Sequence, residues 1–135
     1  MREILFRAKK TDGKWEYGNL YVLGECAFII SDVGFQKSVI PETVGQYTGL
    51  TDKNGTKIFG GDILMAHLDE DFPENKSFAK VIFKDFSFCL QEFSPCNEIM
   101  PDPIQKEDGE LWEVIGNIQD NDLEDFKLTL SKRLF

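Results

Sequence analysis

Turn-forming residues recur along this chain at short intervals, and they limit the length of any helix or strand between them. The densest cluster is Thr51-Asp52-Lys53-Asn54-Gly55-Thr56, which Gly60-Gly61-Asp62 follows closely. Glycine and asparagine tolerate positive φ, and an aspartate carboxylate can accept hydrogen bonds from nearby backbone N–H groups. Further turn signals stand at Asp12-Gly13 and Gly24-Glu25. Turns about every 8–12 residues predict many short strands.

The apolar segments between these turns favour strands over helices. The 135 residues include 12 Phe, 2 Trp and 3 Tyr, and aromatic side chains fit the pleated, half-buried surface of a sheet. We therefore predict a mainly β fold, a small β-barrel or sandwich of bent strands with SH3-like elements, and we expect residues 1–135 to form one domain. The predicted strands are 3–8, 14–17, 20–23, 26–31, 44–50, 58–59, 63–66, 79–84, 86–90 and 111–118.

Two acidic segments and the C-terminal tail depart from this strand pattern. Residues 67–77 and 94–110 are rich in acids and prolines and predict long surface loops. In the tail, Leu123, Phe126, Leu130 and Leu134 have helical spacing, with Asp120 or Asp122 as the N-cap. Alternation of apolar residues over 126–130 leaves a final strand open as the alternative.

Charge is unevenly distributed along the chain. Residues 1–65 hold eight acids and eight bases, whereas residues 66–125 hold sixteen acids and four bases. The acidic part repels phosphate, so it disfavours nucleic-acid binding through this half. No apolar run is long enough to cross a membrane. The three cysteines, Cys26, Cys89 and Cys96, lack metal-site spacing, and we expect free thiols in a reducing cytoplasm.

Known catalytic and cofactor motifs are missing from the sequence. The single histidine, His67, lies in the acidic loop, and no Gly-x-Ser-x-Gly elbow or Gly-x-Gly-x-x-Gly loop occurs. We therefore predict no catalytic residue, no metal and no cofactor, and we lean against an enzyme. Four phenylalanines could stack bases on a β surface, but we expect them to pack in the core. They are Phe83, Phe86, Phe88 and Phe93.

Residues 39–63 read Val-Ile-Pro-Glu-Thr-Val-Gly-Gln-Tyr-Thr-Gly-Leu-Thr-Asp-Lys-Asn-Gly-Thr-Lys-Ile-Phe-Gly-Gly-Asp-Ile. This stretch closely resembles the signature of the YopX-like family of phage and prophage proteins. The segments 2–8 and 112–118 resemble the two flanking blocks of that family, in the same order. The resemblance implies a predominantly β fold and an origin in a bacterial mobile element. It implies no particular activity and supplies no catalytic residues.

Most of this signature consists of residue types that tight turns require, but turn formation does not explain some of its polar residues, which suggests that they bind a partner. Gln46, Tyr47 and Thr48 lie between two glycines, and we expect them to be exposed. The predicted binding surface comprises Gln46, Tyr47, Thr48, Asp52, Asn54 and Asp62.

Three functions follow as hypotheses. The first is a non-enzymatic accessory protein that binds a macromolecule, above all a host or phage protein. The second is a nucleic-acid-binding module that uses the neutral N-terminal half. The third, weakest hypothesis is an enzyme with a carboxylate site. Self-association through exposed edge strands is a further expectation. The basic and aromatic residues of the second hypothesis are Arg2, Arg7, Lys9, Lys10, Tyr47 and Lys57.

Overall fold

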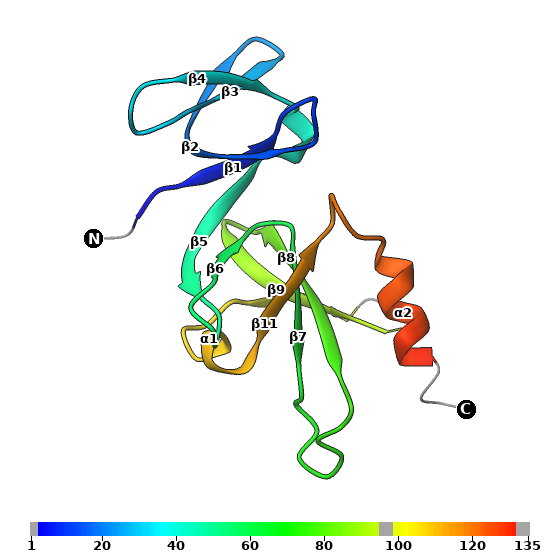
Figure 1. The fold of residues 1–135 in the computed structure, drawn as a ribbon. Coiled ribbons are helices and arrows are strands. Elements are labelled where there is room, and N and C mark those ends of the chain that lie inside the picture. The colour runs from blue at the N-terminus through cyan, green and yellow to red at the C-terminus, as the bar shows by residue number, and fades with distance from the viewer. Residues whose placement is uncertain (1–2, 95–98, 132–135) are drawn as a thin grey trace. The chain divides into compact units, whose positions relative to one another are not determined.

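The computed structural model describes residues 3–94 and 99–131, and their side chains as far as residue 127. The chain divides into two compact units, residues 1–49 and residues 50–135, which we call the N-terminal and C-terminal units. This division does not test whether the two units fold independently, so a single domain stays a prediction. Figure 1 labels most of the elements of both units.

The N-terminal unit is built from antiparallel strands in the order β4-β3-β2-β1-β5. The element β5 continues past Gly49 into the C-terminal unit, where β6 is its next neighbour in the same sheet. The bounds are β1 (Phe6–Lys9), β2 (Trp15–Leu23), β3 (Cys26–Ile30), β4 (Gln36–Val39), the 3-10 turn η1 (Pro41–Thr43), β5 (Gly45–Thr51) and β6 (Lys57–Phe59).

Strand β2 is one long element where two short strands were predicted. Its first half pairs with β1, from Trp15 to Gly18, and its second half pairs with β3, from Asn19 to Leu23. A Cβ atom at Gly18 would collide with the backbone carbonyl group of Ile30. Glycine therefore permits the close backbone approach at the point where β2 changes partners.

The predicted hairpin at Gly24-Glu25 is confirmed. Leu23 faces Cys26 across the two-residue loop, and Gly24 has φ +60°. A positive φ at the first loop position is the requirement of a type II′ turn, which fits the right-handed twist of the flanking strands. The small core on one side of these strands consists of Ala8, Ala27, Ile29 and Val39, with Phe6, Leu20 and Val44 at its margin.

The C-terminal unit contains an antiparallel sheet of five strands in the order β10-β9-β8-β7-β11 (Figure 1). Its strands and helices are β7 (Asp62–Ala66), β8 (Ser77–Lys84), β9 (Ser87–Phe93), β10 (Asp102–Pro103), α1 (Asp108–Leu111), β11 (Glu113–Asn117) and α2 (Leu123–Ser131). The pairing of β11 with β7 shifts between Val114 and Gly116, which marks a β-bulge.

Both faces of this sheet bury apolar side chains, which explains the nearly continuous apolar sequence of β7. Along β7 the side chains alternate. Leu64 and Ala66 join a cluster with Ile58, Ala79, Val81, Leu90 and Trp112. Ile63 joins Phe78 and Phe93 on the other side.

The tail is helical, so the predicted helix is confirmed and the alternative final strand is wrong. Leu123 and Phe126 of α2 pack against the second cluster, where the rings of Phe126 and Phe78 lie 5.2 Å apart. The Asp122 carboxylate accepts the N–H of Glu124 at 3.0 Å, as expected of a helix N-cap. Residues 132–135, with the predicted Lys132, Arg133 and Leu134, lie outside the described residues.

The mainly β class is confirmed, but a closed barrel is not shown, because both sheets have strand orders with two ends. Some predicted boundaries were also wrong. Phe86 is not in a strand but in the β8–β9 turn, and Leu111 belongs to α1. Strand β4 lies within residues 32–43, which were predicted to be irregular, and β10 and α1 interrupt the predicted 94–110 loop.

Candidate functional site

The predicted binding surface does not form one exposed patch. Tyr47 and Thr48 retain only 6% and 7% of their accessible surface, so the expectation that they are exposed is wrong. Asp52 and Asp62 are buried as well, whereas Gln46 is half-buried and Asn54 is exposed. Whether any of these six residues binds a partner stays a prediction, but most of them offer little side chain to the solvent.

Asp52 instead organises the turn between β5 and β6. Its Oδ1 atom accepts the backbone N–H groups of Asn54 at 2.8 Å and Thr56 at 2.9 Å. Its Oδ2 atom accepts the N–H of Val114 at 2.9 Å. A buried carboxylate needs such donors, because an uncompensated charge in the interior is strongly unfavourable. The carboxylate thus ties the turn to the start of β11.

Asp62 has a similar role in the turn between β6 and β7. Its Oδ2 atom accepts the N–H of Phe59 at 2.7 Å in a buried position. Gly61, with φ +90°, supplies the left-handed residue just before it. The sequence predicted both the glycine step and the aspartate–backbone hydrogen bond, and both are confirmed. The carboxylate is almost fully buried, so this hydrogen bond stabilises the turn from within the fold.

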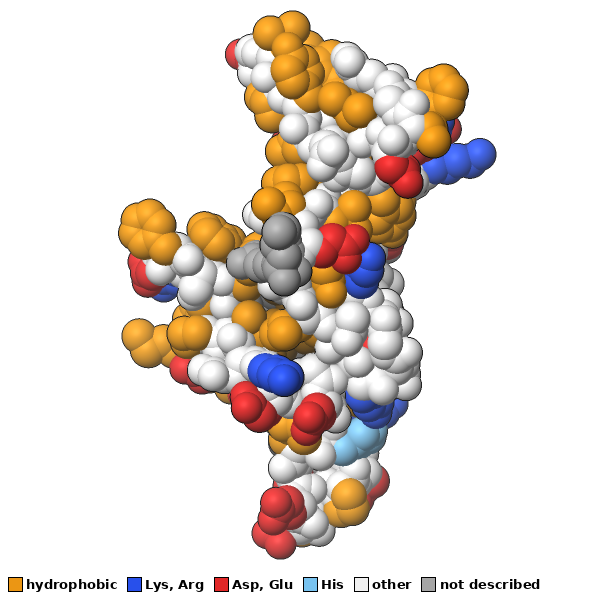
Figure 2. All heavy atoms as spheres, turned by 90° about the vertical axis from the view of Figure 1, so that its left-hand side faces the viewer, with side chains coloured by type: hydrophobic (Ala, Val, Ile, Leu, Met, Phe, Trp, Pro, Cys, Tyr) orange, Lys and Arg blue, Asp and Glu red, His pale blue; other side chains and the backbone are white. Residues whose placement is uncertain are grey.

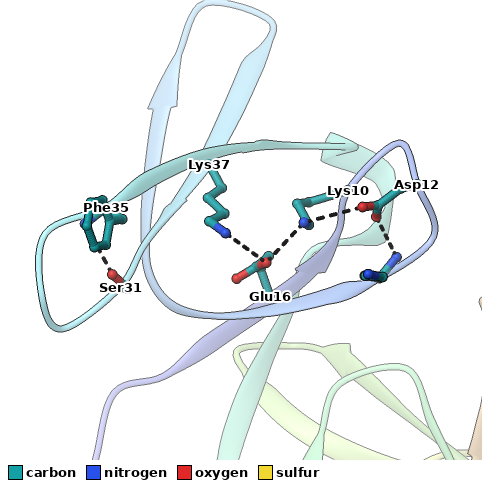
Figure 3. A network of polar contacts seen from close by, with 7 residues as sticks. Lys10, Asp12, Glu16, Ser31, Phe35 and Lys37 are labelled. Carbon is teal, nitrogen blue, oxygen red and sulfur yellow. Dashed lines mark hydrogen bonds and ion pairs between the residues drawn. The ribbon is translucent and has the colours of Figure 1, made fainter.

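The basic residues of the nucleic-acid hypothesis are engaged with neighbouring groups. Lys10 contacts Asp12 and Glu16, both at 3.4 Å, and Lys37 contacts the same Glu16 at 3.6 Å. Figure 3 shows these side chains converging over the strands of the N-terminal unit. The hydrogen bonds that the Lys10 ammonium donates, first to Asp12 and then to Glu16, raise the pKa of Lys10. These ion pairs leave less positive charge for a phosphate backbone.

A second arrangement in the N-terminal unit stacks cations on an aromatic ring. The Arg7 guanidinium lies 4.7 Å from the Trp15 ring centroid, and the Lys9 ammonium lies 5.5 Å from it. Such cation–π contacts are attractive because the ring face is electron-rich. Tyr47 of the same hypothesis is buried, and Arg2 lies outside the described residues.

The carboxylates do not form a metal or catalytic cluster in the described part of the chain, where no three His, Cys, Asp or Glu side chains converge. Burial, together with the nearby Asp102, raises the pKa of Glu92. His67 lies in the exposed loop, where its Nδ1 atom is 3.1 Å from the carbonyl oxygen of Asn75. Cys26 is an exposed free thiol and Cys89 a buried one, whereas Cys96 falls outside the described residues.

Sequence reasoning missed an exposed aromatic surface at the β8–β9 hairpin. Phe86 is 97% exposed and Phe83 is 62% exposed, so the prediction that both pack in the core is wrong. Phe88 is half-buried and packs against the core cluster of Leu64 and Val81, in line with the prediction. Its ring also meets that of Phe83 edge-to-face at 5.1 Å. Phe93 does lie in the core, as predicted. We call Phe83, Phe86 and Phe88 the aromatic tip.

The backbone of this tip is also unusual. Asp85 and Phe86 occupy the two loop positions with φ +52° and +67°. Two positive φ values define the type I′ turn that tight hairpins favour, and asparagine and glycine normally occupy it. A bulky residue there is disfavoured, because its Cβ crowds the backbone. The sequence offers no glycine or asparagine at these two positions, so it gave no sign that Phe86 belongs to the turn and not to the following strand.

Hydrophobic side chains also reach the surface elsewhere, and Figure 2 shows them in several separate places. In the N-terminal unit they include Val22, Leu23, Val33 and Phe35, and in the acidic loop Phe72. Single exposed apolar residues are normal on protein surfaces, but Tyr21, Val22 and Leu23 are consecutive at the β2–β3 hairpin. The aromatic tip differs from this group because Phe86 has a disfavoured backbone conformation.

Comparison with protein families agrees with this fold and with the signature at residues 39–63. The family model described as YopX protein matches residues 5–124. This match covers most of the chain, including the greater part of both compact units and the aromatic tip. The chain therefore belongs to the YopX family. The comparison with curated proteins found no match.

A solved structure of similar fold is the crystal structure of protein EF1440 from Enterococcus faecalis. The two chains share 23% sequence identity, and the alignment has a TM-score of 0.55 and covers 90% of this chain and 96% of the other. At this level of identity the likeness concerns the fold alone. No helix within residues 3–94 and 99–131 is long and apolar enough to cross a membrane.

Proposed function

We propose that this chain is a non-enzymatic protein-binding module of phage or prophage origin that acts in the cytoplasm of a bacterial host. Its partner is a host or phage protein with an apolar pocket that accepts the aromatic tip. Membership of the YopX family supports the origin, because the resemblance links that family to bacterial mobile elements.

The observation that carries the proposal is the exposure of Phe86 on a disfavoured backbone. A phenyl ring that is 97% exposed contributes almost nothing to the stability of the folded chain. Its positive φ even opposes folding. Strained residues persist where the surrounding structure imposes them, and they cluster at functional sites. A large, rigid aromatic side chain can contribute strongly to binding when a partner buries it.

Charge supports a protein partner. The net charge of residues 50–135 is −9, from 18 acids and nine bases. A surface of this sign disfavours approach to nucleic acid or to an anionic membrane. The charges of Lys84 and Asp85, which lie between Phe83 and Phe86 in the sequence, cancel. The aromatic tip therefore presents its rings on a hairpin end without net charge.

The test is a pull-down with the full chain from a lysate of a host that carries the phage. Phe86→Gly removes the ring, and glycine readily adopts the positive φ, so the fold is retained. Phe72→Gly is the matched control, because Phe72 is also exposed but lies in the 67–77 loop. We expect a protein that the wild type and the control retain and that Phe86→Gly loses. Retention by Phe86→Gly, or no specific protein at all, would contradict the proposal.

A nucleic-acid-binding module is the second candidate, and the stack of Arg7 and Lys9 on Trp15 supports it. The ion pairs of Lys10 and Lys37 count against it. Titration of the full chain with single- and double-stranded DNA at several salt concentrations tests whether the chain binds nucleic acid. An affinity that falls steeply with salt and is lost in Arg7→Gln favours this candidate, because counterion release governs such binding.

A further inference from the structure

The exposed residue of the predicted binding surface, Asn54, precedes the only glycine that follows an asparagine in this sequence. An Asn-Gly pair can react without any enzyme. The backbone nitrogen of the glycine loses its proton and bonds to the side-chain Cγ of the asparagine, and ammonia leaves. Water then opens the cyclic imide to aspartate or isoaspartate. Glycine favours this step because no Cβ obstructs the approach.

The turn holds this nitrogen in a different arrangement. The N–H of Gly55 donates to the carbonyl oxygen of Asp52 at 3.0 Å. The N–H of Asn54 donates to Asp52 Oδ1 at 2.8 Å, and the N–H of Thr56 donates to the same atom at 2.9 Å. The nitrogen of Gly55 must leave its hydrogen bond and rotate toward the Asn54 side chain before it can react.

We propose that Asn54 is a site of spontaneous deamidation and that the carboxylate of Asp52 controls its rate by holding the turn closed. Asn54 is exposed, so water reaches the imide as soon as it forms. Asp52 is a positioning residue here, since it contacts only the backbone around the reacting atoms. The rate of the reaction therefore measures how often the Asp52 turn opens.

The product alters the same turn. Aspartate or isoaspartate adds a negative charge beside the Asp52 carboxylate, and isoaspartate also lengthens the backbone by one methylene. Because Asp52 Oδ2 also holds the N–H of Val114, a distorted turn loosens the start of β11. Deamidation thus weakens the C-terminal unit, independently of the proposed protein-binding function.

The experiment follows the deamidation of Asn54 by mass spectrometry in the full chain at mildly alkaline pH. We compare folded wild type, wild type in urea, Asp52→Ala and Asp52→Asn. Relative to folded wild type, we expect Asp52→Ala to react about tenfold faster, which corresponds to about 1.4 kcal/mol. Asp52→Asn keeps one acceptor oxygen, so its deamidation rate should lie between those of folded wild type and Asp52→Ala. Wild type in urea should react at least as fast as Asp52→Ala.

Asp69→Ala is the matched control. Asp69 also accepts two backbone N–H groups in a loop, from Asp71 and Phe72, but it is distant in sequence from Asn54. Its substitution should leave the rate at Asn54 unchanged. Equal rates in folded and urea-treated wild type would overturn the proposal, even if Asp52→Ala fails to fold. A folded Asp52→Ala or Asp52→Asn that reacts as slowly as wild type would overturn it too.

Discussion

The two units of this chain differ in how they hold their aspartates. Residues 1–49 carry six acids and six bases, and Lys10, Asp12, Glu16 and Lys37 pair on the surface. Residues 50–135 carry a net charge of −9, yet they bury the carboxylates of Asp52 and Asp62. The C-terminal unit satisfies these buried charges with backbone N–H groups. An aspartate therefore stabilises its unit strongly when it is buried and hydrogen-bonded, and weakly when it is paired on the surface.

The largest expected effect concerns the bulky core of the C-terminal unit. Trp112 is buried among Ile58, Leu64 and Val81, and Trp112→Ala should lower the free energy of unfolding by about 3–5 kcal/mol. Urea denaturation followed by circular dichroism measures this loss. The control is Leu111→Ala at the neighbouring exposed position, which should change little. Equal losses for both variants would contradict the assigned core.

The second prediction tests the buried carboxylate. Asp62→Ala leaves the N–H of Phe59 without its acceptor, and the free energy of unfolding should fall by about 1–3 kcal/mol. Asp12→Ala, at an exposed aspartate of the N-terminal unit, serves as the comparison and should lose less. A larger loss in free energy of unfolding for Asp12→Ala than for Asp62→Ala would contradict the proposed difference between the units.

The third prediction is a gain in stability. Phe86→Gly relieves the positive φ of a bulky residue, so the free energy of unfolding should rise by up to about 1 kcal/mol. Phe72→Gly relieves no such strain, because Phe72 is not among the residues of positive φ, and it should be neutral or destabilising. Thermal denaturation compares the two variants. A loss in Phe86→Gly would show that the aromatic tip supports the fold, which argues against its binding role.

The smallest effects concern pH, and they have opposite signs in the two units. The N–H of Lys14, and then the Lys10 ammonium, lower the pKa of Asp12 from 3.8. Its contribution to stability is therefore present above pH 3.8 and lost as the pH falls through the lowered value.

Glu92 behaves in the opposite way, because burial raises its pKa from 4.5. Its ionised form disfavours the folded state, so acidification through the raised pKa removes a destabilising charge. Glu92→Gln should then stabilise the chain near neutrality, and this gain should disappear below pH 4.5. Urea denaturation at both pH values checks the sign, and a gain that persists in acid would exclude this explanation.

The sequence predicted those parts of the fold and site that local chemistry determines. The turns at Gly24-Glu25 and Gly61-Asp62 and the cap at Asp122 depend on residues within a few positions of each other, and all are confirmed. Alternation and helical spacing likewise predicted most strands and α2. Such signals act over one turn or one face, so they can be read without knowledge of tertiary contacts.

What the sequence could not show depends on contacts between distant segments. The burial of Tyr47 and Thr48 and the exposure of Phe83 depend on which face of each sheet is covered, whereas Phe86 is exposed because it lies in the β8–β9 turn. Phe86 adopts a glycine-like conformation without a glycine-like sequence. An aromatic residue in an apolar run is expected in the core, but Lys84 pairs with Ser87 and leaves Phe86 in the loop of the hairpin.

The hydrogen bond between Asp52 and Val114 joins residues that are 62 positions apart. Closing so long a loop is entropically slow, and folding rates fall as such non-local contacts accumulate. While the chain emerges from the ribosome, the Asp52 carboxylate must wait for β11 to be synthesised. Until then water solvates the Oδ2 atom of Asp52, and the β5–β6 turn reaches its final form only when the N–H of Val114 replaces that water.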